Sequence, residues 1–154
     1  MNFSGIKIWF LERFPPIHFI SGVFIYLLPK SLASLLLYSQ QHIFLSWTRA
    51  DLFAALIPGF HLLILRVFDE HKDFESDKIH NPNRSLQKGI VTLSQVRNVG
   101  ICALLLQLLC FFILKPSLEI GLIYFAVWVW TLLMWKLSYV AMAMSTPLPL
   151  MPAA

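Results

Sequence analysis

Long apolar stretches alternate with short polar connections along this chain. Four stretches consist almost entirely of apolar side chains, at about residues 17–37, 52–68, 96–114 and 118–142. A helix needs about 20 residues to cross the hydrocarbon core of a bilayer, and stretches of roughly 17–25 residues are long enough. The pattern therefore predicts an all-α fold, an integral membrane bundle of about four transmembrane helices, with residues 1–154 forming a single membrane domain.

The overall composition supports this prediction. Hydrophobic residues make up 58% of the 154 positions and charged residues 13%, whereas a typical soluble domain carries about 25% charged residues. These proportions exclude the disordered, collagen-like and disulfide-scaffold classes. The two cysteines, Cys102 and Cys110, lie in one apolar stretch, and we interpret them as small hydrophobic residues.

The basic residues predict how the chain is oriented in the membrane. The net charge is +4, but Lys and Arg are spread over the polar connections, so no nucleic-acid partner is expected. Seven of them lie in the N-terminal segment and around the long connection 69–95, whereas the other two connections hold only Arg49 and Lys115. The positive-inside rule then places the N-terminus and an acidic loop at 69–95 in the cytoplasm.

An acidic cluster directly follows the second apolar stretch. Five of the eight acidic residues fall within nine positions: Asp69, Glu70, Asp73, Glu75 and Asp77. The spacing places Glu70, Asp73 and Asp77 on one face of a helix, with Asp69 beside them and Glu75 elsewhere. Such carboxylates repel one another unless a cation compensates. Oxygen ligands without Cys or clustered His suit Mg²⁺, so the cluster predicts Mg²⁺ ligands at Asp69, Glu70, Asp73 and Asp77.

Basic residues next to this cluster suit a phosphate partner. Mg²⁺ usually links one or two carboxylates to substrate phosphates, and Arg holds phosphate oxygens through two parallel hydrogen bonds. Because Pro82 ends the helix, we expect Arg84 to fold back toward the carboxylates, and we expect Arg84, Lys78 and Arg66 to bind a diphosphate. At the rim of a membrane bundle, a prenyl diphosphate would keep its tail among the helices. The competing interpretation is a solvated cytoplasmic loop held by local ion pairs.

The same residues resemble the first aspartate-rich motif of the UbiA superfamily of intramembrane aromatic prenyltransferases. That motif has the form N-D-x-x-D-x-x-x-D, followed by P-x-R-P and a glycine. The corresponding positions here are Asp69, Glu70, Asp73, Asp77, Pro82, Arg84, Ser85 and Gly89. Asp for Asn and Glu for Asp keep oxygen ligands, whereas Ser85 replaces the final proline. The Glu-Arg-Phe-Pro sequence at 12–15 is similar to the family's N-terminal entry.

The resemblance implies a fold and an activity. It implies the N-terminal half of a nine-helix fold, in which two aspartate-rich motifs hold Mg²⁺ and a prenyl diphosphate, and the prenyl group passes to an aromatic or related lipophilic acceptor. No acidic residue follows Glu119, so we expect a truncated or split member of the family, or a second chain that supplies the missing half-site. The alternative is a non-catalytic remnant, or a small membrane subunit whose acidic loop binds metal or a partner. An ion transporter is a weaker alternative, because the carboxylates lie at the membrane rim.

Overall fold

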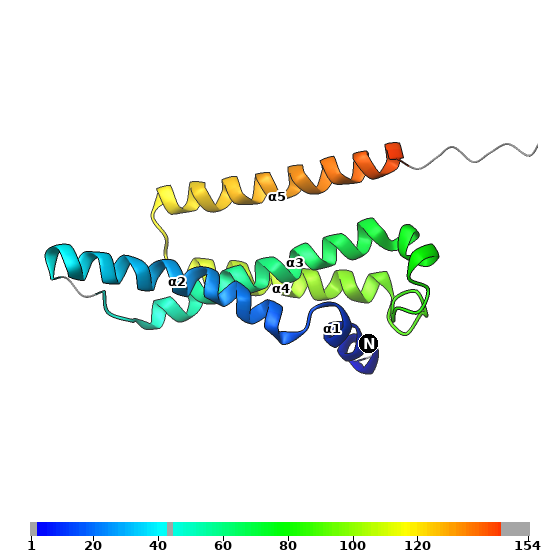
Figure 1. Ribbon diagram of the computed structural model, residues 1–154, viewed down its shortest axis with the longest axis horizontal. Helices are drawn as coiled ribbons and strands as arrows, with labels where there is room; N and C mark the ends of the chain where they lie inside the picture. The colour runs from blue at the N-terminus through cyan, green and yellow to red at the C-terminus, as the bar shows by residue number, and fades with distance from the viewer. Residues whose placement is uncertain (1–2, 43–44, 146–154) are drawn as a thin grey trace, which may run out of the picture. The chain divides into compact units, whose positions relative to one another are not determined.

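The computed structural model describes residues 3–42 and 45–145, with side chains left undescribed at 139 and 141–145. Over these residues the regular structure is entirely α-helical, which confirms the predicted fold class. Figure 1 shows the order of the elements: α1 (Phe3–Arg13), α2 (Pro16–Gln41), α3 (Arg49–His80), α4 (Leu93–Ile113) and α5 (Leu118–Ser145).

Four of these helices, α2 to α5, are long and apolar enough to cross a membrane. Many large apolar side chains of α2 and α4 are exposed on the outside of the protein, such as Leu35 and Phe112. Water would not favour such a surface, whereas lipid does. The chain therefore has the fold of a multi-pass membrane protein.

Local sequence explains where the helices begin and end. Pro16 stands in the first turn of α2, where its missing N–H costs nothing. Thr48 and Thr92 form capping boxes at the starts of α3 and α4. α3 ends at His80, and Asn81, the residue before Pro82, is its C-cap. Pro29 and Pro58 interrupt the apolar pattern of the sequence, but α2 and α3 continue through them.

The helix α3 extends well beyond its apolar stretch. Its 32 residues span about 48 Å at about 1.5 Å per residue, whereas the hydrocarbon core is about 30 Å thick. The prediction of an acidic loop at 69–95 is therefore corrected: residues 69–80 are the last turns of α3, and residues 93–95 are the first turn of α4. The carboxylates gain a fixed helical spacing because the helix continues through them.

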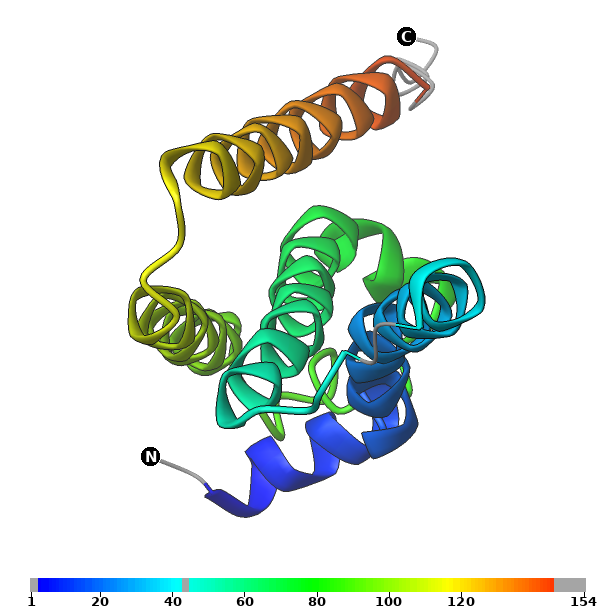
Figure 2. The ribbon, with the colours of Figure 1, turned by 90° about the vertical axis from the view of Figure 1, so that its left-hand side faces the viewer.

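Helices α2 and α4 both pack against α3. It lies between α2 and α4, and α1 lies crosswise to these three helices (Figure 2). Small residues allow the close contacts: a Cβ on Gly22 of α2 would lie 2.6 Å from the Cα of Gly59 in α3, and one on Gly100 of α4 would lie 2.9 Å from a Val67 methyl group. Such small residues are typical of helix contacts in membranes.

The chain divides into two compact units at the connection between α4 and α5. Helices α1 to α4 belong to the first unit, and α5 belongs to the second. The single domain expected from the sequence stays a prediction. All the residues of the candidate site lie in the first unit.

Candidate functional site

Glu70 is the buried centre of a charged cluster at the polar end of α3. Its Oε1 accepts a hydrogen bond from Arg13 Nε of α1 at 2.6 Å and lies 3.0 Å from a terminal nitrogen of Arg66, one turn earlier in α3. The Glu70 side chain is only 1% exposed. A buried carboxylate needs such partners, because taking its charge out of water is otherwise very costly.

Asp77 is the second buried carboxylate of this cluster, two helical turns after Glu70. Its Oδ2 accepts from Arg84, and Arg13 approaches the same oxygen at 3.8 Å. Its Oδ1 accepts from Asn81 Nδ2 at 2.8 Å. Arg84 follows Pro82 and folds back onto the end of α3, so the predicted return of this side chain is confirmed.

The end of α1 and the connection 81–92 hold this cluster in place. Glu12 Oε2 accepts from the backbone N–H of Ser85 at 3.1 Å. Apolar side chains on both segments are buried under the cluster, among them Trp9, Phe14, Leu86 and Val91. Gly89 adopts a φ of 72°, a left-handed conformation that favours glycine, and it allows the connection to turn back toward α4. Arg13 and Arg84 thus reach the carboxylates from two different segments.

Three guanidinium groups face two buried carboxylates, and the carboxylate of Glu12 lies beside Arg84 in the same cavity. The guanidinium groups belong to Arg13, Arg66 and Arg84. Their planar donors match phosphate oxygens well. The cluster therefore offers several guanidinium donors that suit a phosphate group.

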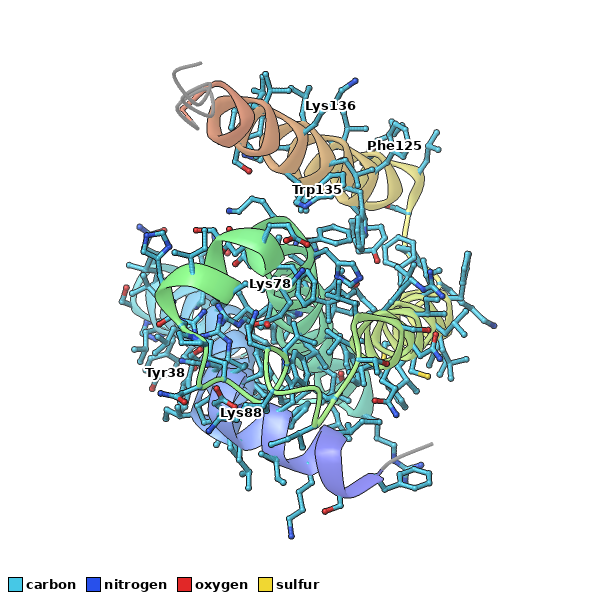
Figure 3. The ribbon with its side chains drawn as sticks, turned by 90° about the vertical axis from the view of Figure 1, so that its right-hand side faces the viewer. Tyr38, Lys78, Lys88, Phe125, Trp135 and Lys136 are labelled. Atoms are coloured by element: carbon cyan, nitrogen blue, oxygen red, sulfur yellow. The ribbon has the colours of Figure 1, made fainter. Side chains whose placement is uncertain are left out.

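The remaining acidic residues lie on more exposed parts of α3. Asp69 and Asp73, which are 46% and 32% exposed, share Lys72 as a neighbour at 3.5 and 3.7 Å. Glu75 pairs with Lys78 at 2.8 Å, and both are largely exposed. Figure 3 labels Lys78 near the end of α3 and Lys88 on the connection that follows. The structure thus brings Glu70, Asp77, Arg66 and Arg84 together, and places Asp69, Asp73 and Lys78 outside that buried group.

A shallow cavity opens beside Arg84. It has a volume of about 290 Å³ and is lined by Glu12, His80, Asn81, Pro82, Asn83 and Arg84. Most of these side chains are polar, and the cavity lies where the end of α1 meets the end of α3. It provides room for a polar group in contact with the guanidinium group of Arg84.

The residues fit Mg²⁺ as a partner that arrives with a phosphate. Glu70 Oε2 is buried and has no hydrogen-bond partner among the described residues, which leaves one carboxylate oxygen available to a cation. Within residues 3–42 and 45–145, no three His, Cys, Asp or Glu side chains already converge as a metal site. Mg²⁺ seldom needs such a cage, because waters and substrate phosphates usually complete its shell.

The sequence did not identify Arg13 as a site residue. Only the Glu-Arg-Phe-Pro resemblance at 12–15 singled out this part of the chain, and the contact with Glu70 joins residues 57 positions apart. A second charged group at the opposite end of α3 was also missed: Asp51 accepts from Lys30 and Tyr26 of α2. Local spacing carries no signal for contacts of this kind.

Comparisons of the sequence with models of protein families and with curated proteins, and of the fold with solved structures, find no match. Function is therefore inferred from the residues and their geometry.

Proposed function

We propose that this chain binds a Mg²⁺–prenyl diphosphate at the polar end of α3, as a UbiA-like prenyltransferase or the N-terminal part of one. The observation that carries the proposal is the group of three arginines around two buried carboxylates, next to membrane-spanning helices. An apolar tail and a diphosphate head match these two environments. The N-terminus and this end of α3 face the cytoplasm in the proposal, in keeping with the distribution of Lys and Arg.

Each group has a role in this proposal. Arg84 and Arg66 hold diphosphate oxygens, and Lys78 adds positive charge at the outer edge. Glu70, Asp73 and Asp77, with Asp69 beside them, hold Mg²⁺, which when bound neutralises charge on the departing diphosphate. The apolar surfaces of the spanning helices keep water away from the prenyl group until a lipophilic or aromatic acceptor captures it.

Transfer needs more carboxylates than α3 provides. In the UbiA superfamily, which the sequence resembles, a second aspartate-rich motif faces the first. Here that half-site is contributed by a second chain or by a longer form of this one. The chain by itself is then a binding half-site, and its activity depends on the partner.

A second candidate function is a non-catalytic membrane subunit. It is favoured by one observation: both buried carboxylates already have arginine partners, as in an ion-pair network that only fixes the fold. In that case the polar end of α3 binds metal or a protein partner and no prenyl diphosphate.

The test is direct binding of farnesyl diphosphate to the full chain in lipid nanodiscs, with Mg²⁺ or with EDTA. We expect saturable binding that requires Mg²⁺. Asp73→Ala should weaken it at least tenfold. Because Asp73 is 32% exposed and its ion pair with Lys72 is long, at 3.7 Å, the variant should still fold. Glu75→Gln is the matched control on the exposed face and should bind like the wild type. Absence of binding, or binding indifferent to Asp73→Ala, would favour the non-catalytic subunit.

A further inference from the structure

Arg13 connects the two buried carboxylates of the site. Its Nε lies 2.6 Å from Glu70 Oε1, and its terminal nitrogen lies 3.8 Å from Asp77 Oδ2. The Arg13 side chain is 14% exposed. Arg66 contacts Glu70 from the same helix, and Arg84 contacts Asp77 from the connection 81–92. Arg13 is therefore the cation that bridges both carboxylates from a different helix.

Arg13 lies beside the place that a divalent cation would take. Glu70 Oε2 has no hydrogen-bond partner among the described residues, so a cation bound there would share the carboxylate whose Oε1 Arg13 contacts at 2.6 Å. Two positive groups on one carboxylate repel each other. A diphosphate brought by the cation offers Arg13 several new acceptors of matching geometry. The exchange requires no movement of α1, because Trp9 and Phe14 on either side of Arg13 are buried and hold the segment.

We propose that Arg13 is the resting counter-ion of this site. Before the ligand binds, it holds Glu70 and Asp77 in position. When Mg²⁺–diphosphate binds, its guanidinium group turns from the carboxylates to the diphosphate oxygens. The inference rests on the proposed function. It adds Arg13 of α1 as a positioning and binding residue, which contacts the carboxylates before the ligand binds and the diphosphate afterwards.

The exchange predicts opposite effects of one substitution on two ligands. In Arg13→Gln, Mn²⁺ alone should bind at least threefold more tightly, because one of the positive groups that repel it at Glu70 is gone. Mn²⁺ takes the same oxygen ligands as Mg²⁺ and is measured by electron paramagnetic resonance. Farnesyl diphosphate with Mg²⁺ should bind at least tenfold more weakly, because one of its donors is gone. A merely structural role would weaken both.

The experiment uses the full chain in nanodiscs, with circular dichroism to check that each variant is helical. Lys7→Gln is the control, because Lys7 is an exposed cation on the same helix, and it should change neither affinity. Arg13→Lys keeps the charge but not the planar donors, so its Mn²⁺ affinity should stay near that of the wild type while diphosphate binding falls. This second variant keeps the test decisive if Arg13→Gln does not fold.

The outcomes separate this inference from the proposed function. Suppose that the wild type binds both ligands, and that Arg13→Gln and Arg13→Lys each change the affinities for Mn²⁺ and for farnesyl diphosphate in the same direction. That result overturns the role of Arg13 and leaves the proposed function standing. A wild-type chain that binds no farnesyl diphosphate overturns the proposed function and this inference with it. Divergent effects of Arg13→Gln beside an unaffected Lys7→Gln support both.

Discussion

The contact between Gly22 and Gly59 makes a quantitative prediction about stability. In Gly22→Ala, the new methyl group would lie 2.6 Å from Gly59 Cα, 2.8 Å from Gly59 N and 3.0 Å from the carbonyl carbon of Pro58. All three are backbone atoms, so relief requires α2 and α3 to separate by about 1 Å, to reach ordinary contact distances. Overpacking of this kind costs about 1–3 kcal/mol.

A gain in helix propensity opposes this cost. Replacing Gly by Ala within a helix favours the helix by up to about 1 kcal/mol. We therefore expect Gly22→Ala to lower the free energy of unfolding by roughly 1 kcal/mol, because the middle of the overpacking range, about 2 kcal/mol, exceeds a propensity gain of about 1 kcal/mol. The assay is equilibrium unfolding in mixed detergent micelles with increasing sodium dodecyl sulfate, followed by circular dichroism.

Gly121 in α5 provides the matched control. A Cβ there meets no atom within 4 Å, so Gly121→Ala keeps only the propensity gain and should be neutral or slightly stabilising. The reasoning is refuted if Gly22→Ala unfolds at the same detergent fraction as the wild type, or if the two variants shift in the same direction by the same amount.

Two further substitutions test the charged cluster and a helix cap by the same unfolding assay. Glu70→Ala leaves Arg13 and Arg66 without their shared acceptor. Because breaking a buried ion pair costs about 3–5 kcal/mol, this variant should lose about that much stability. Glu75→Ala on the exposed face is the control and should change stability by less than about 0.5 kcal/mol. Thr92→Ala removes the side chain that accepts from Gln95 N at 3.3 Å and should cost about 1 kcal/mol, with Thr92→Ser close to the wild type; equal stability of the Ala and Ser variants would argue against the cap.

The lengths of the apolar runs were sufficient to locate the four helices that could cross a membrane. Each predicted stretch corresponds to one long helix, because a run of about 20 apolar residues has few other stable conformations. The predicted helix ends were less accurate where a helix continues beyond its apolar stretch into polar sequence, as α3 does. Residues 69–80 were assigned to the acidic loop 69–95, although the spacing of the carboxylates and Pro82 already predicted a helix there. They continue α3, with no Gly or Pro until Pro82.

The charged cluster was predicted only in part. The spacing identified Glu70 and Asp77 as neighbours on α3, and Pro82 predicted the turn that returns Arg84 to them. The spacing alone did not separate these buried carboxylates from Asp73, which is partly exposed, because burial depends on where α1 and the connection 81–92 pack. The contact of Arg13 depends on that packing entirely.

The contact between Arg13 and Glu70 also constrains how the chain can insert into a membrane. Arg13 precedes α2 and Glu70 lies late in α3, so in a membrane the pair closes only if α2 and α3 cross in opposite directions. If α3 inserted in the inverted direction, Glu70 would lie across a hydrocarbon layer about 30 Å thick from Arg13. Arg13 would then lose its contacts with Glu70 and Asp77, and Glu70 would keep only Arg66 of its own helix. The ion pair thus makes the antiparallel topology of α2 and α3 energetically distinguishable from its inverse.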